Sequence, residues 1–371
     1  MADTAIHKGL AGVVADTTAI STVDAATDSL TYRGYPVQDL ASSRSFEDVA
    51  HLLLLGDLPD AAQLAEFQRQ EREQRQLPTQ LTQLLELLPL SAHPMDTVRT
   101  GLSLLGATDL VLRPEASQFE QAMFLLGKLP SLVAADFRRR HGKEAIEPDR
   151  ELGFAENFFH MCFGELPSRE VIGAFEVSLI LYAEHSFNAS TFTARVVTST
   201  MADLYSACTA AVGSLKGPLH GGANEAVMEM MLKIDDPAKA AAWLRERLAN
   251  KEKVMGFGHR VYKHGDSRVP TMKAALEQVA AVTGGQKWLD MYAELERVMV
   301  GDKGIHPNLD FPAGPAYYLM GFDIPMFTPI FVMSRITGWS AHVLEQAASN
   351  ALIRPLSEYN GPAQRAVPTL S

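Results

Sequence analysis

The sequence predicts an all-α protein with many helices, and three observations support this prediction. Segments with helix-starting and helix-stopping residues follow one another along most of the 371 residues. Regular alternation of strands with helices is absent, which argues against a parallel sheet covered by helices. Only residues 11–36 contain short β-leaning pieces, broken by Asp, Thr and Gly, and they predict a minor β-hairpin near the N-terminus.

Capping residues locate the first helices. Ser45, with Asp48 three residues later, resembles a capping box, and Gly56 supplies a stop signal. Asp60 can cap the following helix. The second part of that helix, residues 68–76, is almost wholly polar, and we expect it to be exposed to solvent.

Apolar spacing and further caps predict the later helices. Residues 81–88 are apolar on nearly every side, which predicts a core helix. Ser168 opens a long helix with a regular apolar stripe. Asp236 can cap another helix, because Pro237 suits the first position after the cap.

A second, smaller domain is predicted from two interruptions of the helical pattern, near residues 216–219 and 315–321. They suggest that residues 220–319 form a smaller helical domain and that residues 1–219 and 320–371 form a larger one. A cluster of helix-breaking residues lies close to the second interruption: Pro312, Gly314 and Pro315.

Composition narrows the class of protein. A net charge of −11 argues against a nucleic-acid binder, which would carry a basic face. Cys162 and Cys208 have no paired spacing, so we expect two buried free thiols and neither a disulfide framework nor a cysteine metal site. No stretch approaches the roughly 20 apolar residues of a membrane span, and no secretory signal is recognisable, so a cytoplasmic location is the expectation.

One basic stretch, residues 251–268, is the first candidate for a binding site. It has five Lys or Arg residues and two acids, and it suits an anionic ligand or, on charge alone, a solvated face. Its Gly256-Phe257-Gly258 run lacks the third glycine and the preceding strand of a dinucleotide-binding motif. It therefore predicts a flexible turn whose amides can approach a ligand closely, with His259 at its exit.

Two further residues are candidates for acid–base chemistry. His220 precedes two glycines and a helical run, so its imidazole would lie at a positive helix end, remain neutral and donate to a developing oxyanion. Asp310 has apolar neighbours, and burial would make it basic enough to remove a carbon-bound proton. A structural histidine and a capping aspartate are the alternatives.

The remaining polar segment, residues 182–191, could hold a carboxylate or simply end a helix. The histidines are scattered, and His259 and His264 are five residues apart, off the i, i+4 spacing of helical zinc sites, so no metal is expected.

These segments, taken together and in order, resemble the citrate synthase family. The resemblance extends from about residue 9 to the end, and it is closest to the compact bacterial citrate and 2-methylcitrate synthases, which share the short Leu-Thr-Tyr-Arg-Gly segment at residues 30–34. The segments that carry it are residues 185–188, 217–224, 256–262, 308–310, 334–335 and 353–355.

The resemblance implies an enzyme in which a large and a small helical domain close over oxaloacetate. Asp310 would abstract the α-proton of an acyl-CoA while neutral His220 hydrogen-bonds the thioester oxygen. His259 would polarise the oxaloacetate carbonyl as the enolate attacks it, and water would then hydrolyse the CoA thioester. Acyl-CoA would be a co-substrate, with no permanently bound cofactor.

The resemblance also implies binding residues and a homodimer with composite sites. Oxaloacetate would be bound by His185, Asn188, Arg268, Arg335 and Arg354 of the partner subunit. CoA would be bound by Val254, Met255, Gly256, Phe257, Gly258 and Lys263, with Phe331 near the acyl group. The larger synthases' N-terminal β-rich extension is not recognisable, so neither NADH inhibition nor a hexamer is expected.

The acyl group and the direction of the reaction remain open. The substrate could be acetyl-CoA, propionyl-CoA or both, and a strict 2-methylcitrate synthase of propionate catabolism is one alternative. Ala313 and Gly314 could leave room for the extra methyl of a propionyl group. Two further alternatives are a citryl-CoA-lyase-like enzyme and a non-catalytic helical dimer.

Overall fold

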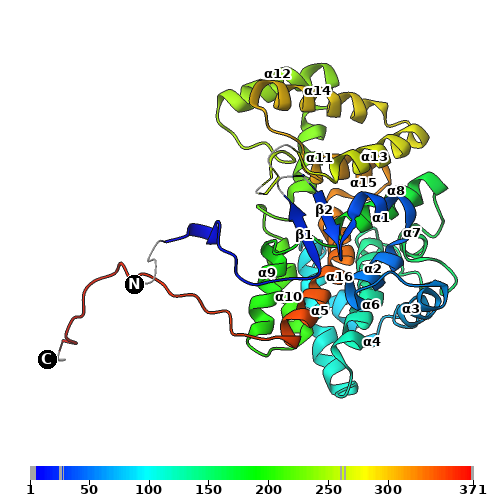
Figure 1. The fold of residues 1–371 in the computed structure, drawn as a ribbon. Coiled ribbons are helices and arrows are strands. Elements are labelled where there is room, and N and C mark those ends of the chain that lie inside the picture. The colour runs from blue at the N-terminus through cyan, green and yellow to red at the C-terminus, as the bar shows by residue number, and fades with distance from the viewer. Residues whose placement is uncertain (1–5, 25–26, 28, 260, 263–264, 369–371) are drawn as a thin grey trace.

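The computed structural model describes residues 6–24, 27, 29–259, 261–262 and 265–368. These residues form a three-stranded sheet and sixteen α-helices, so the prediction of an all-α protein with a minor β element is confirmed (Figure 1). The strands are β1 (Ser21–Asp24), β2 (Ser29–Tyr32) and β3 (Tyr35–Pro36), and two short 3-10 helices are η1 (Lys8–Leu10) and η2 (Ile324–Met326).

The helices follow in chain order. The first ten are α1 (Val37–Ser43), α2 (Phe46–Leu55), α3 (Ala61–Glu73), α4 (Thr79–Leu87), α5 (Pro94–Leu112), α6 (Gln118–Arg140), α7 (Phe154–Phe163), α8 (Arg169–Tyr182), α9 (Ala189–Ser199) and α10 (Leu204–Leu215). The last six are α11 (Ala223–Ile234), α12 (Pro237–Ala249), α13 (Val269–Thr283), α14 (Gln286–Lys303), α15 (Asp310–Leu319) and α16 (Phe327–Ala348).

The small sheet is antiparallel in the order β1-β2-β3, with Ser21 opposite Tyr32 and Thr31 opposite Pro36. Leu30 and Tyr32 alternate with half-buried neighbours along β2 and are fully buried. The Tyr32 hydroxyl donates to the carbonyl of Glu184 at 2.9 Å, which joins the sheet to the end of α8.

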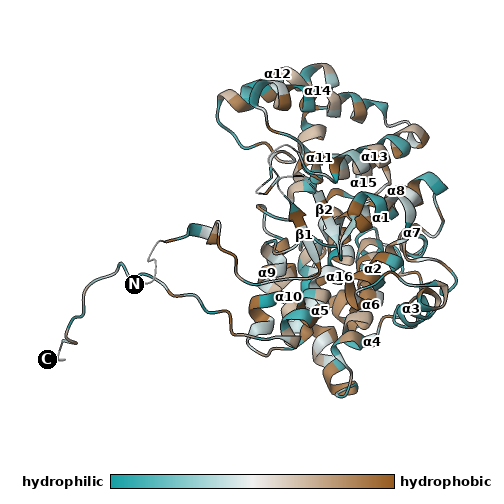
Figure 2. Cartoon of the chain, in the orientation of Figure 1, coloured by the Kyte–Doolittle hydropathy of each residue, from teal (hydrophilic) through white to brown (hydrophobic). Residues whose placement is uncertain are grey.

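Helix α16 lies at the centre of the larger group of helices and is buried along most of its length. It packs against α2, α6, α8, α9 and α10. Figure 2 shows hydrophobic residues along α16 and α6 and a largely hydrophilic α3 at the surface. This pattern is expected of a buried central helix surrounded by amphipathic ones.

Helices α11 to α15 form a second group at the top of Figure 1, in which α12 packs on α14 and α15 packs on α11 and α13. Helix α13 also packs on α8 and so connects the two groups. Helices α11 to α15 all fall within residues 220–319, and the division of the chain into two domains stays a prediction.

The predicted caps are confirmed. Ser45 and Asp48 form a capping box, and Gly56 ends α2 in a left-handed conformation with φ of 100°. The Asp60 carboxylate accepts the first amides of α3, and Asp236 accepts an amide of α12. Cys162 and Cys208 are buried free thiols.

The expectation that residues 68–76 are solvated is wrong for two of them. Glu71 and Arg75 are each 1% exposed and form an ion pair at 2.8 Å. Arg75 also donates to the carbonyls of Asp149 and Leu152. A buried charged pair is tolerated here because these additional acceptors satisfy the guanidinium, which a local pattern cannot reveal.

The prediction of a core helix at residues 81–88 is only half right. Leu81 and Leu85 are buried, but Leu87 is 81% exposed. Helix α4 packs on α5 with one face, so its other leucines remain near solvent.

The cluster of helix breakers lies inside α15 and does not end it. Pro312 is in the first turn, where an amide has no partner within the helix. A Cβ on Gly314 would lie 2.7 Å from the carbonyl oxygen of Asn224, so this glycine allows α11 to approach closely. Pro315 removes the amide that would donate to Phe311, a single bond that the packing of α15 on α11 and α13 offsets.

The two ends of the described chain extend away from the helical body (Figure 1). Residues 349–368, after α16, have no regular structure and are almost all exposed. Within the described chain, none of the helices is long and apolar enough to span a membrane.

Candidate active site

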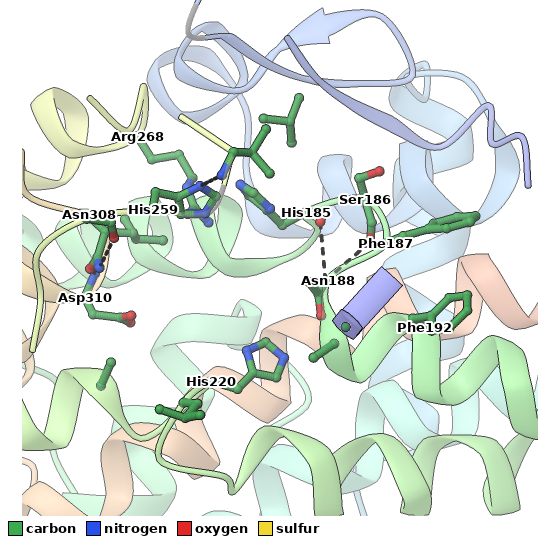
Figure 3. Close-up of a pocket in the computed structure, with 18 of the residues that line it drawn as sticks. His185, Ser186, Phe187, Asn188, Phe192, His220, His259, Arg268, Asn308 and Asp310 are labelled. Carbon is green, nitrogen blue, oxygen red and sulfur yellow. Dashed lines mark hydrogen bonds between the residues drawn. The ribbon is translucent and has the colours of Figure 1, made fainter. Parts of the chain in front are cut away.

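A cavity of about 1270 Å³ lies where helix ends from both groups meet (Figure 3). Nearly all of the predicted site residues line it. They are His185, Asn188, His220, Val254, Met255, Gly256, Phe257, Gly258, His259, Arg268, Asp310, Phe331 and Arg335. Lys263 lies outside the described residues, and Arg354 is exposed in the C-terminal segment and does not line this cavity.

Most of these side chains are placed by helix ends. His185 follows α8, Asn188 caps α9, Arg268 precedes α13 and Asp310 is the first residue of α15. Helix ends suit an anion-binding site because N-terminal amides and their dipole favour negative charge.

His220 is neutral at physiological pH, because burial first and Arg335 second lower its pKa to about 3. Its Nε2 lies 3.2 Å from the backbone nitrogen of Ser190 and 2.8 Å from the Ser190 hydroxyl oxygen, which itself donates to Asn188. Acceptance of the amide N–H places the ring proton on Nδ1, whereas donation to the hydroxyl places it on Nε2. The helix N-terminus that contacts the ring is that of α9, not that of the helix that follows His220 in the sequence.

The tautomer of His259 is defined by two backbone amides. Its Nδ1 accepts the backbone N–H groups of Val261 at 3.0 Å and Tyr262 at 3.2 Å, so its proton is on Nε2. Burial and then Arg268 lower its pKa to about 4. His259 can thus donate a hydrogen bond from Nε2 without carrying a charge.

His185 lies beside His259, with ring centroids 5.0 Å apart (Figure 3). Burial, Arg268 and His259 hold its pKa well below its usual range, so it is also neutral. Its Nε2 is buried and has no partner among the described residues. A buried polar atom without a partner at a cavity wall is a candidate ligand contact.

Asp310 has a pKa raised to about 6 by burial. Its Oδ1 accepts the hydroxyl of Tyr182 at 2.6 Å, which partly offsets that rise. Among the described residues, none donates a hydrogen bond to the other carboxylate oxygen, which is therefore available to a reacting group. The sequence did not predict a role for Tyr182. This residue is the last of α8 and lies three positions before His185, so its place next to a predicted site residue was the available signal.

The two buried arginines differ in what they can offer a ligand. Arg268 donates to both oxygens of Asp266, at 2.9 and 2.7 Å. Asp266, which the sequence suggested only as one acid of a basic stretch, therefore fixes this guanidinium. Arg335 donates from Nε to the carbonyl of Tyr182 at 2.6 Å, but its NH1 is buried without a partner in the described chain.

The turn at residues 254–258 is less open than its glycines suggested. Gly256 and Gly258 have φ of 85° and 78°, and a Cβ on Gly256 would lie 2.5 Å from a methyl of Val227. The Gly258 amide donates to the carbonyl of His306, and the Gly256 carbonyl accepts the amide of Asn308. The expectation of free amides is therefore wrong for Gly258. Its N–H bonds the carbonyl of His306 and so connects the segment that carries His259 to the segment that carries Asp310.

Three other expectations are refined by the packing. The Asn188 amide group caps α9, where its Oδ1 accepts the N–H of Thr191 at 3.1 Å. Phe331 packs on Tyr182, with ring centroids 4.2 Å apart. Ala313 and Gly314 do not line the cavity, and Gly314 faces α11, so the suggestion that they make room for an acyl methyl is wrong.

No group of three His, Cys, Asp or Glu in the described part of the chain is arranged to hold a metal ion. The cavity contains three neutral imidazoles, one carboxylate of raised basicity and two arginines. Such a set can move a proton from carbon and stabilise two developing oxyanions for a substrate with carboxylates.

Comparison with known proteins agrees with this geometry. Residues 9–356 match the family model described as citrate synthase, C-terminal domain. The chain is 62% identical to a 2-methylcitrate synthase of Mycobacterium tuberculosis, over 98% of this chain and 92% of that protein. It is also 62% identical to a citrate synthase of Mycolicibacterium smegmatis, over 98% and 97% respectively.

Solved structures show the same fold. A ternary complex of carboxymethyl coenzyme A and oxaloacetate with citrate synthase from Thermoplasma acidophilum superposes with a TM-score of 0.92 at 32% identity, covering 98% of each chain. Citrate synthase from Thermotoga maritima gives a TM-score of 0.88 at 38% identity, again covering 98% of each chain.

Proposed function

This chain belongs to the citrate synthase family, and we propose that it condenses an acyl-CoA with oxaloacetate and water to give citrate or 2-methylcitrate and free CoA. The observation that carries this proposal is the meeting, in one cavity, of a carboxylate of raised pKa with two neutral histidines. Each of these groups suits one half of a condensation.

The first half removes a proton from the α-carbon of the acyl-CoA. The Asp310 carboxylate accepts that proton, and its raised pKa makes it a better base than an exposed aspartate. Charge moves to the thioester oxygen, where the Nδ1–H of His220 donates. The product of this step is an enol or enolate of the acyl-CoA.

The second half forms the carbon–carbon bond. The enol carbon attacks the keto carbon of oxaloacetate, and the Nε2–H of His259 stabilises the new alkoxide. The unpartnered NH1 of Arg335 and Nε2 of His185 can bind the substrate carboxylates together with Arg268 and Asn188. Water then hydrolyses the citryl-CoA-type thioester, and CoA leaves as the thiol.

The CoA half of the substrate is proposed to lie along residues 254–258, with Phe331 near the acyl group and Lys263 toward a phosphate. CoA is then a co-substrate, with no resident cofactor and no metal. We also propose a cytoplasmic location, which the bacterial origin of the curated relatives supports.

Thiol release tests the proposed function directly. Wild-type protein is mixed with oxaloacetate and either acetyl-CoA or propionyl-CoA, and free CoA is measured, with oxaloacetate omitted as the control. Oxaloacetate-dependent release is expected from at least one thioester, and release from neither overturns the proposal. The ratio of the two kcat/KM values distinguishes a citrate synthase from a strict 2-methylcitrate synthase, since relatives of both names are equally similar.

The pH dependence should report Asp310. Its pKa is raised to about 6, so the carboxylate is ionised above that pH and protonated below it. Because only the ionised form accepts the α-proton, kcat/KM for acyl-CoA is expected to fall about tenfold for each pH unit below 6. His220 and His259, with pKa values of about 3 and 4, do not titrate in that range.

Replacement of Tyr182 by Phe provides the matched variant for this profile. The Tyr182 hydroxyl lowers the Asp310 pKa, so its loss is expected to move the midpoint of the acid limb to higher pH. A midpoint that stays in place or moves down would show that another group controls the limb.

A homodimer with composite sites is also proposed, in which Arg354 of the partner subunit completes the oxaloacetate site. Its support is that Arg354 lies in an exposed segment that extends from the body and is absent from the cavity of its own chain. Sedimentation or light scattering of the wild type should therefore give twice the mass of 40.5 kDa.

Mixing two inactive variants tests the shared site. Asp310→Asn and Arg354→Ala homodimers are each expected to be nearly inactive. After subunit exchange, half of the dimers are mixed, and each mixed dimer has one intact site, so activity should recover to about a quarter of wild type. No recovery, although mass spectrometry confirms exchange, would mean that Arg354 acts within its own subunit or not at all.

A further inference from the structure

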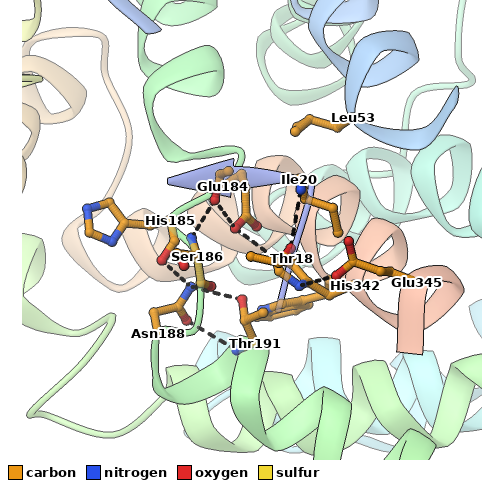
Figure 4. Close-up of polar contacts among 12 residues, drawn as sticks. Thr18, Ile20, Leu53, Glu184, His185, Ser186, Asn188, Thr191, His342 and Glu345 are labelled. Carbon is orange, nitrogen blue, oxygen red and sulfur yellow. Dashed lines mark hydrogen bonds and ion pairs between the residues drawn. The ribbon is translucent and has the colours of Figure 1, made fainter. Parts of the chain in front are cut away.

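A chain of buried polar side chains lies behind the segment that carries His185 (Figure 4). Its members are Ser21, Glu184, Arg195 and His342, which are between 0% and 6% exposed. None of these four is among the described residues that line the cavity. They connect β1, the end of α8, α9 and α16 behind the site.

The direction of each hydrogen bond in this chain is defined. A guanidinium can only donate, so NH1 of Arg195 donates to Nδ1 of His342 at 3.0 Å. His342 then has its proton on Nε2, which donates to Oε1 of Glu184 at 2.9 Å. The Glu184 carboxylate is the acceptor at which the chain ends.

Ser21 connects the same carboxylate to the backbone on the far side of His185. Its hydroxyl donates to Oε1 of Glu184 at 2.9 Å and accepts the amide N–H of Ser186 at 2.8 Å. Because the single hydroxyl hydrogen goes to Glu184, the oxygen lone pairs remain to accept that amide. Ser21 thus holds the residues immediately before and after His185.

The backbone of this segment needs such support. Ser186 has φ of 49°, in the left-handed region that non-glycine residues adopt only at a cost. On the other side, the Tyr32 hydroxyl accepts the Glu184 amide at 3.2 Å and donates to its carbonyl at 2.9 Å. His185 therefore lies between Glu184 and Ser186, which are both held by hydrogen bonds from Tyr32 or Ser21.

The His185 imidazole packs against the rings of His259 and Tyr262, with centroids 5.0 and 5.7 Å apart. Its Nε2 has no hydrogen-bond partner in the described chain, so the position of the ring depends on these contacts and on the backbone that carries it. The negative charge of Glu184 also acts on Arg335, whose NH1 is likewise buried without a partner. The Glu184 carboxylate therefore acts on Arg335 through its charge and on His185 through the backbone.

We propose that Ser21 and Glu184 are positioning residues for oxaloacetate: they hold the Glu184–Ser186 segment so that the His185 imidazole faces the substrate. The inference rests on the proposed function, because it assumes that His185 contacts oxaloacetate. Neither residue touches the substrate, and both act through His185.

Ser21→Ala tests this most cleanly because it removes no charge. The hydroxyl that bridges Glu184 and the Ser186 amide is lost, and the KM and Kd for oxaloacetate are expected to rise about tenfold. The KM for acyl-CoA should change less than about twofold. Ser178→Ala is the matched control, since Ser178 is buried and its hydroxyl likewise both donates, to the carbonyl of Phe175, and accepts, from the hydroxyl of Tyr317, but bonds no atom of the Glu184–Ser186 segment.

A double-mutant cycle distinguishes positioning from general destabilisation. In a His185→Ala background, Ser21→Ala should weaken oxaloacetate binding no further, because the residue through which it acts is gone. Glu184→Gln, which keeps an acceptor for Ser21, should bind oxaloacetate more tightly than Glu184→Ala. The melting temperature is recorded for every variant.

The outcomes separate this inference from the proposed function. Wild type that binds no oxaloacetate overturns both. Wild type that binds, with Ser21→Ala binding as tightly, overturns only the positioning role. An equal rise of KM for both substrates, or an undiminished effect in the His185→Ala background, also overturns it, because a merely structural residue would give that result.

Discussion

Asp310→Asn is expected to lower kcat for oxaloacetate-dependent CoA release by about a thousandfold, the usual range for loss of a general base. The amide keeps the shape of the carboxylate and can still accept the Tyr182 hydroxyl, so the cavity should stay intact. What it loses is the ability to take a proton. Initial rates at saturating substrates, at pH 8 where wild-type Asp310 is ionised, provide the measurement.

Two observations make this result specific. Oxaloacetate binding to Asp310→Asn should remain within about twofold of wild type, because His185, Arg335 and Arg268 are unchanged. Asp109→Asn is the control, since Asp109 is also a buried carboxylate with a tyrosine partner, Tyr205. It should lower the melting temperature and leave kcat unchanged. Full activity of Asp310→Asn would remove Asp310 as the base.

His220→Gln is expected to lower kcat by about a hundredfold to a thousandfold, as removal of one oxyanion donor does. The structure adds a finer expectation. Nε2 of His220 contacts both the amide and the hydroxyl oxygen of Ser190, so the proposed donor to the thioester is Nδ1. An asparagine amide can occupy the position of Nδ1, whereas a glutamine amide extends to that of Nε2, so His220→Asn should retain more activity than His220→Gln.

Comparison of kcat for His220→Asn and His220→Gln tests which ring nitrogen of His220 donates. Equal loss in both, or greater activity in His220→Gln, would place the donor on Nε2 and contradict this proposal. His141→Asn is the control, because His141 lies at the end of α6 beside Asp323, away from the cavity. The KM for oxaloacetate should be unaffected in all three, as His220 is proposed to contact the thioester.

Local signals predicted the positions of most helices and of the site segments. Ser45, Asp60 and Asp236 begin helices because a short side chain can accept the first free amides, which depends only on neighbours in sequence. The segments that carry His220, His259 and Asp310 were also recognisable from short stretches of sequence. Their resemblance to the citrate synthase family predicted most of the residues that line the cavity.

Contacts between distant segments decided the rest. Arg75 is buried because carbonyls of residues 149 and 152 surround it, and the breakers of α15 are tolerated because α11 lies against Gly314. The partnership of Tyr182 with Asp310 joins residues 128 positions apart.

The sequence by itself therefore determined which groups are available: a helical fold, three histidines, one aspartate and the arginines. Only the tertiary structure decided how they are protonated. Burial lowers the pKa of His220 and His259 and raises that of Asp310, and Ser190, thirty residues from His220 in the chain, supplies the partners of its Nε2. Charge and hydrogen bonding depend on what surrounds a group in space, and the order of residues alone does not specify it.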